Sequence, residues 1–420
     1  MRAEERMSRR DFLRGAAAGA AWALLLRPEG VTGAQEGSSG PPLRCGLIGT
    51  GSQGLTLLTQ AARLGRIRIE ALCDVYEPHL QRAQKEAPEN ARTYTDYRQL
   101  LDKEKELEAV LVATPPHTHL EIGRAALEAG KHVFCEPPLA VDLEEARTLA
   151  RLGQEAKQVF QVGVQKRTHP LYRHVLKFVR VGVLDRVTWV RAQWQRKLSL
   201  RRPVKNPEQE RLLNWKLYRE FSGGLITEYG LHQFDVASWM LRALPVAVSG
   251  FGATLLWRDG REVPDTVSCI LEYPKGVRFL YSATLTNSFE GAYEVFYGSM
   301  GAIWVNDTNG WLFKEADAPM LGWEVYARKE KRDNYQGIAL IAEATKLLKQ
   351  GIDPAELKEL PTYNPFYTEL EAFYRSIREE KEVLCGPQEG WQATLVAWKV
   401  AEAVEKGTRV KIEPTLCSLT

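Results

Sequence analysis

Near its N-terminus the chain reads Leu43-Arg44-Cys45-Gly46-Leu47-Ile48-Gly49-Thr50-Gly51-Ser52-Gln53-Gly54. A short apolar run ends in three glycines with the spacing G-x-G-x-x-G, and a helix-like pattern follows. The first glycine permits a tight turn, the second lets the backbone approach a diphosphate, and the third lets the helix pack on the strand. The N-terminus of such a helix attracts phosphates with free N–H groups and a partial positive charge. We therefore predict a dinucleotide site that includes Gly49, Gly51, Ser52, Gln53 and Gly54.

A second apolar run, residues 67–73, ends directly before Asp74, twenty residues beyond the third glycine. The Asp74 carboxylate can accept hydrogen bonds from both hydroxyls of a ribose, whereas a 2′-phosphate would meet its negative charge. No arginine follows in residues 75–78 to offset that charge. The predicted coenzyme is therefore NAD, and NADP is disfavoured. A glycine-rich turn with a purely structural role is the alternative, but it leaves the order strand, turn, helix, strand and acid unexplained.

The first 34 residues have the pattern of a targeting signal. A twin-arginine pair at residues 9–10 precedes an apolar segment at 16–26, and small residues at 32–34 suit cleavage. The apolar segment is far shorter than the roughly 20 residues of a membrane span, so no stable transmembrane span is expected. We expect twin-arginine export to the periplasm or another extracytoplasmic location, with a linker at residues 35–42. Retention of the segment as a membrane tether is the alternative.

The composition is that of a soluble globular protein, with 44% hydrophobic residues, 26% charged residues and a net charge of +3. Nothing in this balance indicates a nucleic-acid partner. The six cysteines lack C-x-x-C spacing, which argues against a disulfide framework and against a cysteine metal site, so no metal is predicted. A chain of 420 residues is long for a single core and suits two domains.

Strand and helix patterns alternate over residues 43–163, which predicts an α/β domain of the Rossmann type with a parallel sheet. Residues 164–413 contain a helix pattern at 225–241, extended segments between 246 and 305, and three late helix patterns at 335–350, 365–379 and 389–405. This order predicts a second α/β domain with a large, open, mostly antiparallel sheet. The C-terminal helices would pack back on the fold, and residues 414–420 would form a tail.

An open sheet leaves one apolar face that must be covered. A homo-oligomer, either a dimer or a tetramer, is the expected solution. Helices of the same chain are the alternative.

Four further blocks of the chain accompany the glycine turn. They are residues 113–119 (ATPPHTH), 135–140 (CEPPLA), 164–167 (VQKR) and 223–235 (GGLITEYGLHQFD). In order and spacing these five blocks resemble the glucose–fructose oxidoreductase and inositol dehydrogenase family (Gfo/Idh/MocA), over about residues 43–413. Residues 214–219 resemble members with twin-arginine signals. The resemblance implies hydride exchange between a nicotinamide coenzyme and a sugar or cyclic polyol.

Two positions depart from the family pattern. Dehydrogenases of the family usually have Glu-Lys-Pro where this chain has Glu136-Pro137-Pro138, and that lysine handles the proton beside the reacting hydroxyl. The usual Asp-x-x-x-His reads Glu228-Tyr-Gly-Leu-His232 here. Because proline has no proton to give, the proton carrier must lie elsewhere. The Pro-Pro pair itself predicts a rigid turn, with a cis bond as one form.

Removal of a hydroxyl proton requires a base with a pKa near ambient pH, and histidine meets this need. We expect His232 to be the acid/base. On a helix, Glu228 would share its face and orient the imidazole, with Asp235 close to the same face. A satisfied interior histidine is the alternative for His232. Lys166 is a candidate replacement ammonium, against the alternative of a surface lysine.

The resemblance also implies positions for the bound molecules. Thr114, Pro115 and His119 would line the nucleotide, although a helix-start or surface role is the alternative for His119. Glu136 would lie near the nicotinamide ribose. The substrate cleft would be bordered by Gln165, Lys166 and Arg167.

Three hypotheses about function remain from the sequence. The first is an NAD-dependent oxidoreductase acting on a sugar or cyclic polyol. The second is an NAD-dependent glycoside hydrolase or lyase that oxidises its sugar transiently. The third is a non-catalytic protein that binds nucleotide and sugar, and Pro137 is its main support.

Overall fold

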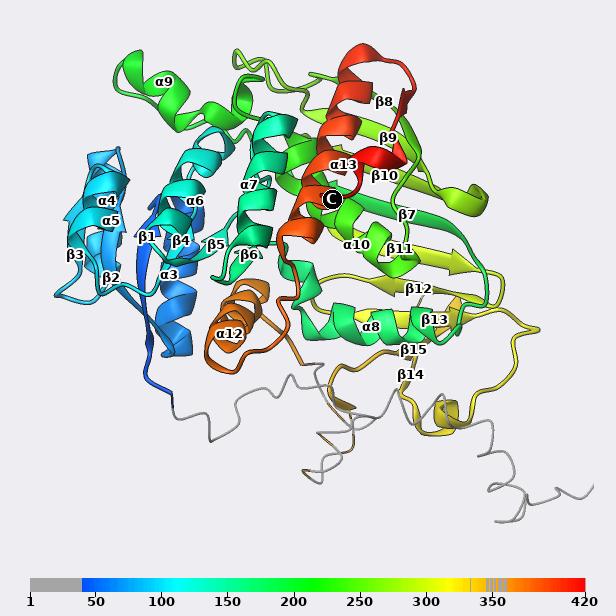
Figure 1. The fold of residues 1–420 in the computed structure, drawn as a ribbon. Helices are drawn as coiled ribbons and strands as arrows, with labels where there is room; N and C mark the ends of the chain where they lie inside the picture. The colour runs from blue at the N-terminus through cyan, green and yellow to red at the C-terminus, as the bar shows by residue number, and fades with distance from the viewer. Residues whose placement is uncertain are drawn as a thin grey trace, which may run out of the picture.

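The computed structural model describes residues 40–419 except 333, 345–346, 348–349, 351–352, 354–356 and 358–360. The predicted signal at 1–34 and most of the linker at 35–42 lie outside the described residues. Two sheets stand side by side in this part of the chain (Figure 1). The predicted α/β class, with one parallel sheet and one large, mostly antiparallel sheet, is confirmed.

The first sheet has the order β3-β2-β1-β4-β5-β6 within the described residues, and every pair of neighbours is parallel. Its strands are β1 (Leu43–Ile48), β2 (Ile67–Cys73), β3 (Arg92–Tyr94), β4 (Ala109–Val112), β5 (His132–Cys135) and β6 (Phe160–Val162). Its helices are α3 (Ser52–Leu64), α4 (Glu77–Glu86), α5 (Tyr97–Lys103), η2 (Pro116–Thr118), α6 (His119–Glu128) and α7 (Leu143–Glu155). The strand order reverses between β1 and β4, and ligands of such sheets bind outside the carboxyl ends of the strands at that point.

The second sheet has the order β14-β15-β13-β12-β11-β7-β10-β9-β8-β16 in the described part of the chain. Only β7 and β10 run parallel among its pairs there. Its strands are β7 (Val187–Gln195), β8 (Ala247–Ala253), β9 (Thr266–Glu272), β10 (Arg278–Thr284), β11 (Ala292–Gly298), β12 (Gly301–Val305), β13 (Gly310–Lys314), β14 (Lys329–Arg332), β15 (Tyr335–Ala339) and β16 (Val410–Lys411).

One face of the second sheet is covered by α8 (Pro170–Arg180), α10 (Leu231–Leu241) and α13 (Pro387–Lys406) (Figure 1). Alternate residues of β9, Val267, Cys269 and Leu271, are buried on that side. The remaining short elements are η3 (Gln165–Arg167), α9 (Glu208–Leu213), η4 (Trp215–Leu217), η5 (Ile226–Gly230), η6 (Pro274–Gly276), η7 (Gly322–Tyr326) and η9 (Pro414–Leu416).

The helix α12 (Pro365–Arg378) packs on α3 and completes the core of the first domain. Its Leu370, Phe373 and Tyr374 are buried in the same cluster as Leu57 and Phe134. The late patterns at 365–379 and 389–405 are therefore helices that pack back on the fold, as predicted. Among the described residues, no helix is long and apolar enough to cross a membrane.

The helix predicted at 335–350 is wrong at its start. Residues Tyr335–Ala339 form β15, which pairs with β13 on one side and β14 on the other. The side chain of Phe313 packs against the position of Gly337, where an added Cβ would lie 2.9 Å from the ring. Pairing with two neighbouring strands outweighs the local helix pattern here.

Candidate active site

The glycine turn joins β1 to α3 and has the geometry that a diphosphate needs. Gly49 has a φ of +90°, and an added Cβ would lie 2.6 Å from the Ala113 carbonyl carbon. A Cβ on Gly54 would lie 1.9 Å from the Gly49 carbonyl oxygen. No side chain caps α3 at Gly51, so its first N–H groups are open to a ligand. The backbone therefore makes room for a phosphate group and supplies donors to it.

Asp74 lies at the carboxyl end of β2, next to this turn. Its carboxylate accepts hydrogen bonds from the backbone N–H groups of Thr50 at 2.7 Å and Tyr76 at 2.8 Å. The Nδ1 atom of His79 lies 3.7 Å away. Burial acts to raise the pKa of Asp74, but the contacts with His79, Tyr76 and Thr50 outweigh it and lower the pKa. The carboxylate is thus ionised, at the end of the strand where the sequence predicts the ribose of NAD.

His119 contacts the backbone of the loop after β4 with its ring nitrogens. It is buried, and its ring nitrogens lie 2.9 Å from the Pro138 carbonyl oxygen and 2.8 Å from that of Thr114. Burial lowers its pKa to about 4, so the ring is neutral. The Pro137–Pro138 bond is cis. His119 therefore ties the Thr114-Pro115 loop to the Pro-Pro turn.

Glu136 directly follows β5, and its side chain contacts α3, the helix that follows the glycine turn. Its carboxyl group accepts a hydrogen bond from Gln53 Nε2 at 2.8 Å. Burial raises its pKa to about 7, although the Gln53 hydrogen bond and the Lys216 charge act in the opposite direction. Glu369 of α12 is also buried, and burial together with the Glu136 charge raises its pKa well above the ordinary value. Two acids thus share a poorly solvated region behind the glycine turn.

Lys216 lies in the same region and was missed by the sequence analysis. Its ammonium lies 2.8 Å from the Glu228 carboxylate, which also accepts a hydrogen bond from Ser222 Oγ at 2.9 Å. Burial acts to lower the pKa of Lys216, but the Glu228 charge raises it above its ordinary value. The side chain is 39% exposed and passes the ring of Tyr229. The resemblance of residues 214–219 to family members with twin-arginine signals was the available sequence signal for Lys216.

The predicted contact between Glu228 and His232 is wrong. Glu228 is engaged by Lys216 and Ser222, and His232 Nδ1 is buried without a hydrogen-bond partner among the described residues. The reason lies in η5 (Ile226–Gly230), which is a π-helical turn. Residues four apart do not stack across such a turn as they do in an α-helix. Burial and the charges of Lys166 and Lys216 lower the pKa of His232 to about 3, so its imidazole is neutral.

The expected roles of Asp235 and Arg167 are also corrected. Their side chains form two hydrogen bonds, at 2.9 and 2.8 Å, and both residues are buried. Burial acts to lower the pKa of Arg167, but Asp235 outweighs it and raises the pKa. A cavity of about 320 Å³ adjoins the pair beside α10 and α13, away from the glycine turn. The pair ties η3 to α10, so the Asp235 carboxylate is engaged by Arg167 and is not a free base.

Lys166 is not a surface lysine, because its side chain is only 13% exposed. Its ammonium pairs with Asp307 and lies 4.7 Å from the centre of the Tyr172 ring. Burial lowers its pKa to about 8, opposed by the charge of Glu294. Beside it, the Oε1 atom of Gln165 is buried without a partner in the described part of the chain. Gln165 and Lys166 thus retain free hydrogen-bonding capacity for a polar ligand.

Comparison with known proteins agrees with this geometry. Residues 43–164 match the oxidoreductase family with an NAD-binding Rossmann fold, and residues 179–412 match the C-terminal α/β domain of the same family. The chain belongs to the Gfo/Idh/MocA oxidoreductase family. It is an oxidoreductase with an NAD-binding Rossmann domain, and the glycine turn, Asp74 and Glu136 fit that coenzyme.

Two curated relatives and one solved structure illustrate the likeness. Inositol 2-dehydrogenase of Rhizobium meliloti (strain 1021) is 26% identical over 268 residues, 62% of this chain and 74% of the relative. The 2,7-anhydro-N-acetylneuraminate hydratase of Mediterraneibacter gnavus is 29% identical over 228 residues, 50% of this chain and 52% of the relative. Levoglucosan dehydrogenase in complex with NADH and levoglucosan superposes with a TM-score of 0.71 at 20% identity, over 88% of this chain and 99% of that protein. That structural likeness establishes the fold.

Proposed function

We propose that this protein transfers hydride between NAD and a hydroxyl-bearing carbon of a sugar or cyclic polyol. The observation that carries the proposal is the ion pair of Lys216 with Glu228, 2.8 Å apart. The Lys216 charge acts on both Glu136 and His232. Lys216 thus supplies an ammonium whose charge acts on Glu136, the residue before Pro137. Pro137 occupies the position of the family lysine. The inositol 2-dehydrogenase relative supports this substrate class.

Each side chain has a distinct task in the proposed reaction. Bound NAD supplies the nicotinamide carbon that exchanges hydride with the substrate. The Lys216 ammonium stabilises the negative charge that develops on the reacting oxygen. His232 is neutral and therefore free to accept the hydroxyl proton, but its pKa of about 3 makes it a weaker base than the pKa near ambient pH expected from the sequence. Gln165 and Lys166 hold the other hydroxyls.

The test uses the full chain with NAD and a panel of sugars and polyols, followed by the absorbance of reduced nicotinamide. Lys216→Met should lower kcat by about 10²- to 10³-fold, as for loss of one oxyanion donor, and leave NADH affinity unchanged. Lys197→Met removes an exposed lysine of the substrate domain and should change neither kcat nor NADH affinity. Pro137→Lys should restore part of the activity of Lys216→Met. A large gain from Pro137→Lys in the unmodified chain would contradict the proposal, because the native protein would then lack its proton carrier.

A second candidate is a hydrolase or lyase that oxidises its sugar transiently and returns the hydride. The hydratase relative favours this alternative. Release of product without net NADH would distinguish it from the oxidoreductase. If neither NADH nor any product is formed across the panel, a non-catalytic role in binding nucleotide and sugar gains support.

We also propose that the protein is a homo-oligomer. Trp189 of β7 and Ile270 of β9 point to the face opposite α10 and are 38% and 46% exposed. Leu280 lies between their strands, paired with Ile270 and with Arg191. An apolar face of this kind suits a second copy of the chain. Light scattering of the purified protein tests this, and Trp189→Glu with Ile270→Glu should shift the mass to that of one chain.

For localisation we propose export by the twin-arginine route. The support is the signal pattern of residues 1–34. A reporter fused to the full chain should appear outside the cytoplasm, and replacement of Arg9 and Arg10 by lysine should abolish its export.

A further inference from the structure

We propose that Arg202, from the substrate domain, contacts the diphosphate of bound NAD and slows the release of the coenzyme. The proposal rests on NAD binding by the Rossmann domain and is independent of the substrate. Arg202 was not among the residues expected at the coenzyme site.

The Arg202 guanidinium reaches across to the glycine turn. Its Nη2 atom donates a hydrogen bond to Ser52 Oγ at 2.5 Å, and its Nη1 atom lies 3.3 Å from His79 Nε2. Ser52 is the first residue of α3 and follows Gly51 directly. A cation from one domain therefore stands at the helix N-terminus of the other, where the first backbone N–H groups are uncapped.

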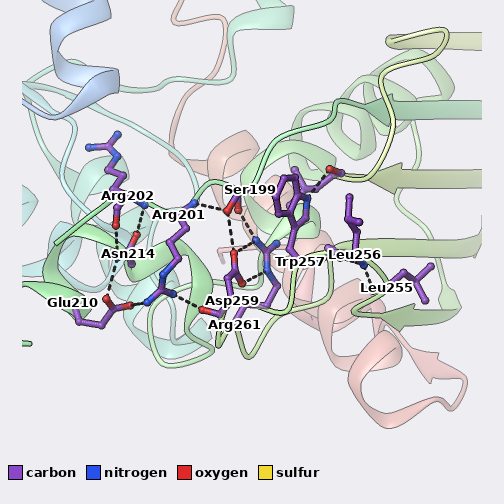
Figure 2. Close-up of polar contacts among 12 residues, drawn as sticks. Ser199, Arg201, Arg202, Glu210, Asn214, Leu255, Leu256, Trp257, Asp259 and Arg261 are labelled. Atoms are coloured by element: carbon purple, nitrogen blue, oxygen red, sulfur yellow. Dashed lines mark hydrogen bonds and ion pairs between the residues drawn. The ribbon is translucent and has the colours of Figure 1, made fainter.

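The backbone of Arg202 is fixed by Asn214, which is only 1% exposed. Asn214 Oδ1 accepts a hydrogen bond from Arg202 N at 2.7 Å, and its Nδ2 atom donates to Arg202 O at 3.0 Å (Figure 2). The backbone that carries the guanidinium is thus held in place before any ligand arrives. Pre-organisation of this kind lowers the entropic cost of binding.

The segment around Arg202 is also tied to the loop between β8 and β9. Arg201 donates to Glu210 at 2.8 Å and to the Asp259 carbonyl at 2.6 Å (Figure 2). Asp259 in turn accepts hydrogen bonds from Ser199 at 3.0 Å and Arg261 at 2.7 Å. These contacts fix residues 199–214 against the loop between β8 and β9, next to the glycine turn.

The charge of Arg202 is not matched by a protein carboxylate. Among the described residues, no aspartate or glutamate lies within ion-pair distance of it, whereas Arg201 is paired with Glu210. A guanidinium with free N–H groups prefers two oxygens of one anion. A 2′-phosphate would meet the ionised Asp74, so the anion of NAD that suits this position is the diphosphate.

The experiment measures binding by calorimetry and release by stopped-flow fluorescence in the full chain. Arg202→Met should weaken NADH and ADP-ribose by about tenfold to a hundredfold, mostly through faster release, and leave adenosine unchanged. Arg211→Met is the matched control, because it removes an arginine of the same segment that pairs with exposed Glu220. That control should bind all three ligands normally. Arg202→Lys keeps the positive charge but cannot donate two parallel hydrogen bonds to one anion, so its loss of NADH affinity should be intermediate.

Two outcomes would overturn the proposal. In the first, Arg202→Met binds NADH and ADP-ribose as the unmodified protein does, or loses affinity for adenosine equally. In the second, NADPH is titrated as a fourth ligand and is the only one whose binding is weakened, which would assign Arg202 to the 2′-position. Because binding is measured without turnover, either result is separate from failure of the proposed reaction.

Discussion

The Lys216 ammonium and the Glu228 carboxylate lie 2.8 Å apart, and Ser222 Oγ holds the other carboxylate oxygen at 2.9 Å. Lys216 comes from η4, whereas Glu228 comes from the π-helical turn that leads into α10. The Lys216 charge also acts to lower the pKa of Glu136, and the position after Glu136 is proline. The proposed chemistry depends on that replacement.

Glu228→Gln tests the electrostatic part of the pair. The Glu228 charge raises the pKa of Lys216 against the effect of burial, so its removal should lower that pKa. Activity that needs the ammonium is lost as the pH rises through this pKa. The alkaline limb of kcat/KM should therefore move to lower pH in Glu228→Gln and stay in place in the exposed control Glu220→Gln. If the alkaline limb of kcat/KM does not move in Glu228→Gln, the reaction does not depend on the protonation of Lys216.

His232→Ala should lower kcat by about 10²- to 10⁴-fold, the usual contribution of a general acid/base. The Nδ1 atom has no hydrogen-bond partner among the described residues, so the substitution breaks no hydrogen bond there. The melting temperature and the NADH affinity should then remain close to those of the unmodified protein. Retained turnover would return His232 to an interior, structural role.

Asp74→Asn should weaken the binding of NADH and reduce the preference for NADH over NADPH, because the substitution removes the negative charge expected at the ribose. The substitution also has a pH signature in the free protein. The pKa of Asp74 is lowered from 3.8 by folding, so its ionised form stabilises the fold above that value, and this stability is lost as the pH falls through the folded-state pKa. Urea unfolding at neutral and acid pH should show about 1 kcal/mol less pH dependence in Asp74→Asn. Equal pH dependence would contradict the hydrogen bonds described for Asp74.

Asp235→Asn should destabilise the protein by about 3–5 kcal/mol, because it leaves the Arg167 charge buried without its partner. Chemical unfolding measures the loss. The double variant Arg167→Met, Asp235→Leu should recover much of it, since neither charge then remains. A catalytically dead but fully stable Asp235→Asn would instead favour the acid/base role that the sequence had indicated.

Local backbone requirements made the glycine turn predictable. The positive φ of Gly49 and the close approach of Gly54 to the turn follow from chain geometry alone, and the spacing to Asp74 follows from the length of one helix and one strand. The parallel sheet and the mostly antiparallel sheet were predictable for the same reason. Each is built from patterns that repeat within a short window.

The structure of the proposed catalytic region depends on contacts between distant segments. The π-helical turn changes the stacking between Glu228 and His232, and the residue pattern carries no mark of it. Arg167 forms hydrogen bonds with Asp235, which lies 68 residues further along the chain. Lys216 lies in a segment that has no strand or long helix, so no local pattern marks its position. β15 was predicted as helix because its strand partners are not visible from its own residues.

The most direct measurement is the fate of substrate hydrogen. The full chain is incubated with NAD and a panel of sugars and polyols deuterated at carbon, then denatured, and the released nucleotide is weighed by mass spectrometry. The account predicts reduced nicotinamide that carries deuterium from at least one substrate, with labelling slowed by about 10²- to 10³-fold in Lys216→Met. Unlabelled nucleotide across the whole panel, with NAD shown to be bound, would contradict it.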